Sequence, residues 1–115
     1  MARTWPDAST LEDRMHRLTV QYFSPADPAA FDERYESTHV PLVHALPGLK
    51  SFTLSRPQAL GADAPYLVAE LWFEDGDALA AALGSPEMAA AAEDSEKYEV
   101  ASRTMFSGEV RETLG

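Results

Sequence analysis

The chain of 115 residues contains no cysteine. That absence excludes disulfide bonds, thiolate nucleophiles and metal or cluster sites with cysteine ligands. It is typical of a cytoplasmic protein, which is the location we expect. The sequence also lacks an apolar run long enough to span a bilayer, and residues 1–13 lack the apolar centre of a signal peptide. We therefore expect no membrane partner.

Basic residues are scarce, with 9 lysines and arginines against 19 aspartates and glutamates, and the formal net charge is -10. A surface of this sign repels phosphate backbones, so nucleic acid is not an expected partner. The isolated glycines form no phosphate-binding loop. His16 and His44 lack the spacing to make a metal site with His39. We expect neither a metal nor an organic cofactor.

What is present is the composition of a globular domain, in which 45% of residues are hydrophobic and 24% are charged. A chain of this length forms one domain with a modest core. Residues 1–14 are predicted to be a flexible N-terminal arm, and residues 15–112 are predicted to be the folded domain.

Periodicity along the chain predicts strands and helices in turn. Alternating apolar residues from Leu18 to Tyr22 predict a first strand. A helix capped by Asp27 is predicted to run from residue 28 to about His39, and Pro41 is expected to break or kink it. Its apolar face is predicted to continue for another turn, until Pro47-Gly48 ends it. The same patterns predict further strands at 49–57, 66–73 and 98–110, and helices at 78–83 and 87–93.

The order βαββαβ, with right-handed crossovers, predicts a ferredoxin-like α+β sandwich: a four-stranded antiparallel sheet with helices on one face. We expect Phe23, Val68, Trp72 and Met105 to lie on the other sheet face. Such a face is too apolar to remain in water. Burial against a second copy would cover it, so we predict a homodimer that packs sheet to sheet.

The most distinctive stretch contains Phe31, Tyr35 and His39, which are spaced four residues apart. A helix places such residues on one face. Because an imidazole titrates near neutrality, His39 beside Tyr35 can exchange protons with a small molecule in an apolar pocket. Alternatively, His39 bonds a backbone carbonyl where Pro41 interrupts the helix, and Tyr35 and Phe31 are core residues. Both interpretations stay open.

The chain resembles the EthD family, whose members are small proteins of the dimeric α+β barrel superfamily. The resemblance extends from His16 to Val110 and rests on the run Tyr35-x3-His39-x-Pro41-Leu42-Val43, on Pro47-Gly48-Leu49, and on the aromatic strand from Pro65-Tyr66 to Trp72-Phe73. It implies a ferredoxin-like subunit that pairs into a shared barrel, with a pocket between sheet and helices into which His39 points.

The EthD protein itself is associated with bacterial degradation of ethyl tert-butyl ether, beside a cytochrome P450 system. Relatives in the superfamily include cofactor-free monooxygenases and polyketide cyclases, muconolactone isomerase and haem-degrading monooxygenases. The resemblance therefore fixes the fold better than it fixes the reaction.

Candidate site residues follow from these patterns. His39 and Tyr35 are the candidate catalytic residues, and the candidate substrate-binding residues are Tyr22, Phe31, Trp72 and Phe73. Because Trp72 and Phe73 are adjacent in a strand, one is expected to line the pocket and the other the dimer interface.

Charged residues in the apolar segments have simpler explanations. Glu70 is predicted to pair with Arg103 or Arg17 across the sheet, or else to be a second acid–base group. The acidic run at residues 93–96 is predicted to be a solvated helix end.

Three functions are compatible with these residues. The leading hypothesis is a protein that binds an aromatic or polyketide-like compound and catalyses its cofactor-free oxygenation, cyclisation or isomerisation. The second is a non-catalytic accessory or carrier protein for a partner oxygenase. The third is a haem-binding protein with His39 as axial ligand.

Overall fold

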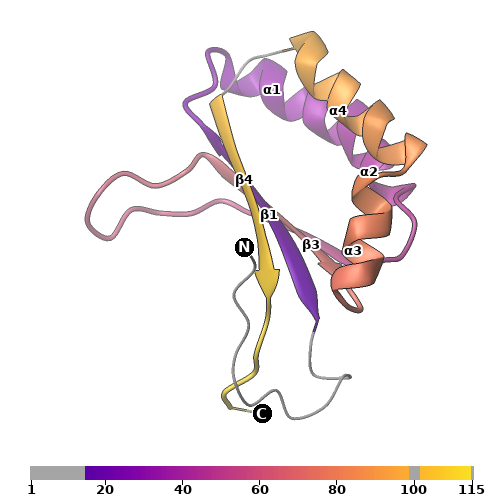
Figure 1. Cartoon of the computed structure of the whole chain (residues 1–115). Coiled ribbons are helices and arrows are strands. Elements are labelled where there is room, and N and C mark those ends of the chain that lie inside the picture. The colour runs from indigo at the N-terminus through magenta and orange to yellow at the C-terminus, as the bar shows by residue number, and fades with distance from the viewer. Residues whose placement is uncertain (1–14, 99–101, 115) are drawn as a thin grey trace.

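The computed structural model describes residues 15–98 and 102–114, which form one sheet and a layer of helices (Figure 1). The expected arm at residues 1–14 lies outside the described residues, and the domain boundary stays a prediction. In chain order the elements are β1 (His16–Phe23), α1 (Pro28–Arg34), η2 (Tyr35–His39), α2 (Val40–His44), β2 (Leu49–Ser55), β3 (Leu67–Phe73), α3 (Gly76–Leu83), α4 (Pro86–Tyr98) and β4 (Ser102–Glu109).

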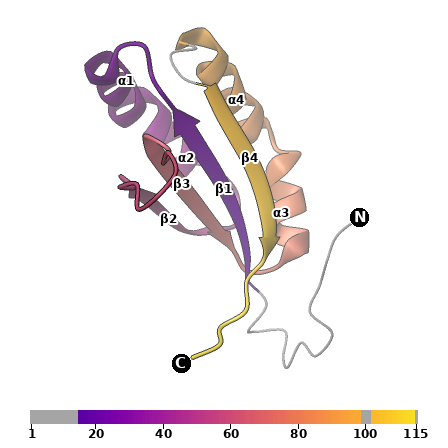
Figure 2. The same cartoon turned by 90° about the vertical axis from the view of Figure 1, so that its left-hand side faces the viewer.

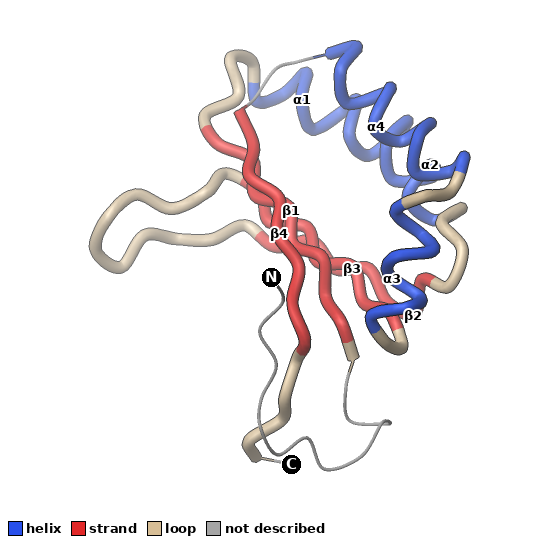
Figure 3. The backbone as a smooth tube through the Cα atoms, viewed as in Figure 1, coloured by secondary structure: helices blue, strands red, loops and turns tan. Residues whose placement is uncertain are grey.

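The sheet has the strand order β2-β3-β1-β4, and every neighbouring pair is antiparallel. Figure 2 shows β2 and β4 at its two edges, and Figure 3 shows all the helices on one face. This is the ferredoxin-like arrangement predicted from the order of the elements. Among the described residues, no helix is both long and apolar enough to cross a bilayer.

The core lies between the sheet and the helices. Alternate residues of β3, from Leu67 to Phe73, are buried because this central strand turns one face to the helix layer. The exposed fractions of Phe73 and Phe31 are 0% and 1%. The ring of Tyr22 meets that of Phe31 edge-on, with 5.3 Å between the ring centroids. Strand periodicity and the aromatic helix face therefore build one apolar layer.

The predicted first helix is present, and its predicted continuation past His39 is confirmed by α2. Asp27 caps α1, since its side chain accepts a hydrogen bond from the backbone N–H of Ala30 at 3.2 Å. The irregularity expected near Pro41 is not a break: the helix widens into the π-helical turn η2, where the N–H of Val40 donates to the carbonyl of Tyr35. Proline lacks an N–H and crowds the carbonyl four residues earlier, and a turn with one extra residue relieves both constraints around Pro41.

The sheet face opposite the helices differs from the prediction at one residue. The register pairs Met105 with Val20, so Met105 lies on the helix side of the sheet, and its expected place on the other face was wrong. Phe106, the next residue, pairs with Thr19 and occupies the outer face instead. The error arose because side chains alternate along a strand, so a shift of one residue exchanges the two faces.

Removing a core aromatic ring measures how much the packing between the sheet and the helices contributes to the free energy of unfolding. We expect Phe73→Ala to lower the free energy of unfolding by about 3–5 kcal/mol, because the cavity left by a fully buried ring cannot collapse. Leu60, whose side chain is 102% exposed, is the control, and Leu60→Ala should leave stability unchanged. Urea denaturation checks both. Equal stabilities of the two variants would contradict the described core.

Candidate functional site

A cavity of about 70 Å³ lies between the sheet and the helix layer. Apolar side chains form most of its wall, and its polar lining residues are Tyr22, Tyr35, His39, Ser95 and Arg103. That volume holds a few water molecules, whereas pockets for drug-sized ligands measure roughly 300–1,000 Å³. A ligand larger than this must therefore displace side chains in the wall.

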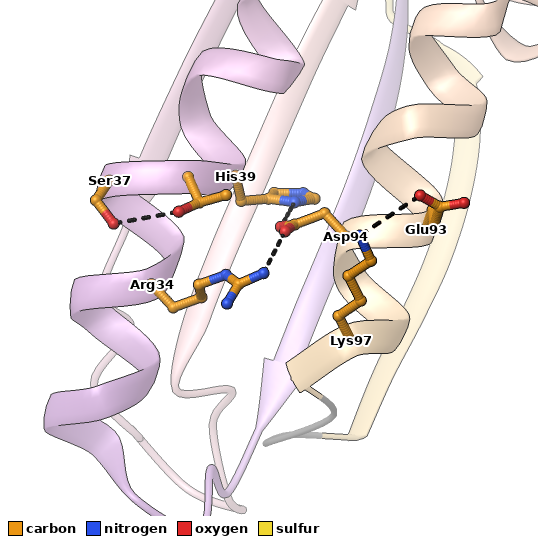
Figure 4. Close-up of polar contacts among 7 residues, drawn as sticks. Arg34, Ser37, His39, Glu93, Asp94 and Lys97 are labelled. Carbon is orange, nitrogen blue, oxygen red and sulfur yellow. Dashed lines mark hydrogen bonds and ion pairs between the residues drawn. The ribbon is translucent and has the colours of Figure 1, made fainter.

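His39 is buried in this wall and bonded to a carboxylate from another helix. Its side chain comes from η2, and its Nδ1 lies 3.1 Å from Oδ2 of Asp94 on α4. The other carboxylate oxygen, Oδ1, accepts a hydrogen bond from Nη2 of Arg34 at 2.9 Å (Figure 4). The exposed fractions of His39 and Asp94 are each 5%. These contacts form a triad of Arg34, Asp94 and His39, in which His39 and Asp94 are buried and Arg34 is partly exposed.

The triad sets the protonation state of His39. Burial lowers the pKa of His39 below its usual 6.5, although the hydrogen bond and the negative charge of Asp94 oppose this change. The ring is therefore neutral at pH 7. Because a carboxylate only accepts hydrogen bonds, the ring hydrogen lies on Nδ1 and the lone pair on Nε2.

Asp94 stays ionised although it is buried. Burial by itself would raise the pKa of Asp94, but the hydrogen bonds from Arg34 and His39 and the charge of Arg34 hold it below its usual 3.8. A buried carboxylate that keeps its charge can stabilise a positive charge on the neighbouring imidazole. His39 is thus oriented to accept a proton and then share its charge with Asp94.

Two tyrosines complete the polar part of the wall. The ring of Tyr35 lies 5.0 Å from that of His39, measured between centroids, and 5.4 Å from that of Tyr22. Burial raises the pKa of the Tyr22 phenol, and a hydrogen bond with Tyr35 opposes that change. The phenol of Tyr22 therefore remains protonated near neutrality, and both phenols can form hydrogen bonds with a ligand oxygen.

Comparison with known proteins assigns the chain to a family. Residues 24–99 match the EthD domain. The chain belongs to the EthD family. An uncharacterised 11.0 kDa protein from the thcB–thcC intergenic region of Rhodococcus erythropolis is 42% identical over 94 residues, which are 80% of this chain and 91% of that protein.

Solved structures share the fold of this EthD chain. An EthD family protein from Bacillus halodurans is 32% identical with a TM-score of 0.74, covering 84% of this chain and 98% of that one. A dimeric ferredoxin-like protein from Thermobifida fusca is 16% identical with a TM-score of 0.66, and the match covers 90% of this chain and 97% of that one. SnoaB, a cofactor-independent oxygenase from Streptomyces nogalater, is 19% identical with a TM-score of 0.61, and the match covers 89% of this chain and 97% of that one. The predicted family and fold are confirmed.

Only some of the site residues predicted from the sequence meet at the cavity of this EthD domain. Tyr22, Tyr35 and His39 line the cavity. Phe31 and Phe73 lie in the core and are not among its lining residues. A substrate-binding role for those two residues stays a prediction that their position does not favour.

Trp72 lies on the sheet face away from the cavity, where it pairs in register with Arg17. The guanidinium of Arg17 lies 5.5 Å from the centre of the Trp72 ring and forms an ion pair with Glu70 at 3.3 Å. The predicted pairing of Glu70 with Arg17 is therefore confirmed. Arg103, the other candidate partner, lies on the opposite face of the sheet and lines the cavity.

Asp94 is the functional residue that sequence reasoning missed. Glu93 and Glu96 are exposed, as predicted for a solvated helix end, and Glu93 pairs with Lys97 at the surface (Figure 4). Asp94 is buried instead, because it lies three residues after the buried Ala91 and shares its helix face. That spacing was the signal that could have identified it.

Metal and haem fit this site poorly. Within residues 15–98 and 102–114, no group of three or more His, Cys, Asp or Glu side chains is placed to hold a metal ion. A haem is too large for a cavity of about 70 Å³ whose wall is made of packed core side chains. The residues described here therefore do not fit an axially ligated haem.

The triad predicts a loss of stability in acid. Because the folded pKa of His39 lies below its usual 6.5, the unfolded chain binds this proton first as the pH falls. The free energy of unfolding should therefore decrease below pH 6.5, and decrease again below 3.8, where unfolded Asp94 protonates before folded Asp94. Urea denaturation over this pH range measures both changes.

A matched pair of variants tests whether His39 causes the decrease in the free energy of unfolding that begins below pH 6.5. His39→Gln should remove much of the decrease that begins below pH 6.5, because the titrating group is gone. His44, which is exposed on α2, is the control, and His44→Gln should keep that decrease. An unaltered pH dependence in His39→Gln would refute the assignment to His39.

Proposed function

We propose that this protein binds a small, largely apolar organic compound, aromatic or polyketide-like, in the cavity between its sheet and helices. We further propose that His39 exchanges a proton with the bound compound in a cofactor-free reaction. The observation that carries this proposal is the buried pair of His39 and Asp94 in the wall of an otherwise apolar cavity. Buried polar groups of this kind are found disproportionately at catalytic sites.

The chemistry follows from the protonation states. Nε2 of His39 takes a proton from an acidic C–H or O–H bond of the compound, and the electron pair of that bond stays on the compound as an enolate or phenolate. Asp94 stabilises the imidazolium that forms, and the phenol of Tyr35 can bond the new oxyanion. Such an anion can isomerise, cyclise or react with dioxygen.

The comparisons support a cofactor-free reaction without identifying it. SnoaB, which shares the fold, is described as a cofactor-independent oxygenase. The likeness at 19% identity extends to the fold alone. The choice between oxygenation, cyclisation and isomerisation therefore depends on the compound that the cavity admits.

Two methionines bear on the size of the compound. Met88 on α4 and Met105 on β4 both line the cavity. Methionine side chains are flexible, so they can move to admit one or two rings. Movement of these two side chains would enlarge the cavity beyond its volume of about 70 Å³.

Deuterium exchange tests the proposed proton transfer. The probe is 2-indanone, an aromatic ketone with acidic C–H bonds, in deuterated buffer. We expect the protein to accelerate exchange at these bonds, and His39→Gln to lower the rate roughly hundredfold because the base is lost. The dissociation constant of 2-indanone should change little. NMR spectroscopy measures both quantities, and His44→Gln, altered on an exposed helix position, is the control.

The outcomes separate the candidate functions. Binding of 2-indanone with exchange no faster than in buffer would identify a carrier and refute the catalytic part of the proposal. Exchange that persists in His39→Gln would also refute the role of His39. If 2-indanone and other one- or two-ring ketones leave the methyl signals of Met88 and Met105 unchanged, the cavity is not a binding site.

The outer face of the sheet supports the proposal of a homodimer. Phe23, Val68, Trp72 and Phe106 lie on this face, opposite the helices. Apolar side chains gathered on one face are typical of an interface. The Thermobifida fusca protein, which shares the fold, is described as dimeric. We therefore propose that two copies pack sheet to sheet.

Two exposed apolar residues offer a matched test of this interface. Phe106 on the outer face is 48% exposed, and Leu83 on α3 is 45% exposed. We expect Phe106→Glu to convert the dimer to a monomer, because it buries a carboxylate at the interface, whereas Leu83→Glu should stay dimeric. Native mass spectrometry reports the mass of each. A monomeric wild-type protein, or a dimer in both variants, would contradict the proposed interface.

A further inference from the structure

Arg103 is a cation at the cavity that the proposed proton transfer does not use. It lies on β4, where the register pairs it with Tyr22, and it lines the cavity together with the buried His39 and Tyr22. Its own side chain is exposed. A residue that both lines the cavity and reaches solvent lies at its mouth.

Arg103 also differs from most other cations of the described chain in its partners. Arg17, Arg34 and Arg56 each pair with a carboxylate, at 3.3, 2.9 and 2.9 Å, and Lys97 pairs with Glu93 at 3.6 Å. Within residues 15–98 and 102–114, no carboxylate forms an ion pair with Arg103. The guanidinium of Arg103 can therefore pair with an anion from solution.

The charge of Arg103 reaches into the cavity. Its positive charge favours the ionised form of Tyr22 and the neutral form of His39, although burial and Asp94 oppose the first effect and Asp94 opposes the second. Both oxygens of Asp94 bond Arg34 and His39, so this carboxylate is not the ion-pair partner of Arg103. The cavity therefore combines an apolar wall with a cation at its mouth.

We propose that the compound bound in this cavity is a small organic acid whose carboxylate pairs with Arg103 while its apolar body lies inside. The inference rests on the proposed binding function and names its ligand class. A guanidinium presents two parallel N–H groups that match the two oxygens of a carboxylate. The acidic surface repels multiply charged anions more strongly than a single carboxylate, which favours a monoacid over a phosphate ester.

The geometry also gives Arg103 a role in specificity. Arg103 lies on β4, whereas His39 lies on η2 and Asp94 on α4. The proton-accepting pair and the anion-binding cation thus come from the helix layer and the sheet on the two sides of the cavity. Arg103 selects which compound enters and how it is oriented, and His39 acts on the compound once it is bound.

Paired probes that differ only in charge test this inference. Benzoate and its neutral analogue benzamide have nearly the same shape. With the full chain labelled at its methionine methyl groups, NMR titration follows the signals of Met88 and Met105, which line the cavity. At neutral pH we expect benzoate to bind about fivefold more tightly than benzamide, as a partly solvated bidentate pair would give.

The decisive variant is Arg103→Gln. It should reduce the affinity for benzoate to that for benzamide and leave benzamide binding unchanged. Lys50 on β2 is the control, because Lys50→Gln removes the same unit of charge from an exposed position on another strand. It should preserve the preference for benzoate. Arg103→Lys should retain part of the preference, since it keeps the charge without the planar fork.

The possible results distinguish this inference from the function on which it rests. Equal binding of both probes by the wild-type protein would overturn the organic-acid inference and leave small-molecule binding intact. A preference for benzoate that survives in Arg103→Gln, or that is lost equally in Lys50→Gln, would overturn the assignment to Arg103. If neither probe shifts the Met88 and Met105 signals, both the inference and the proposed binding function fail.

Discussion

The structure depends on one buried carboxylate. Asp94 joins α4 to the helical run beneath it, because its two oxygens bond Arg34 and His39 at 2.9 and 3.1 Å. An unpaired charge at 5% exposure would be strongly destabilising, so α4 is held where both donors reach it. Among the described side chains of α4, Ala91 is also buried and Met88 packs against the core. The pairing of this carboxylate therefore joins apolar packing in positioning α4, and with it one wall of the cavity.

That pairing depends in turn on the widened turn η2. Arg34 and His39 are five residues apart, and in a regular α-helix their side chains would point about 140° away from each other. The π-helical turn at Tyr35–His39 adds one residue to the turn, which brings both side chains to the same partner. Pro41 requires that adjustment. A proline that looks like a helix stop in the sequence therefore aligns the polar residues of the site.

The sequence predicted the parts of this protein that depend on local patterns. Alternation at Leu18 and Tyr22, and the cap at Asp27, set strands and helices that the structure confirms. Patterns marked Asp94 only weakly, through its spacing from Ala91, because the partner His39 that its carboxylate bonds lies 55 residues away in the chain. Met105 was misplaced for a related reason: an edge strand with mixed residues on both faces does not reveal its register.

The two charged groups at the cavity have opposite relations to solvent, and this difference constrains any ligand. The charge of Asp94 is buried and already satisfied, so it can orient His39 without attracting ions from solution. The charge of Arg103 is exposed and can still accept a partner. Between them lies an apolar wall that weakens screening and strengthens both interactions. A neutral compound would leave the cation at the mouth unmatched, and a wholly polar one would leave the apolar wall uncovered. The compound that satisfies both is amphipathic, with its anionic end outward and its reactive end toward His39.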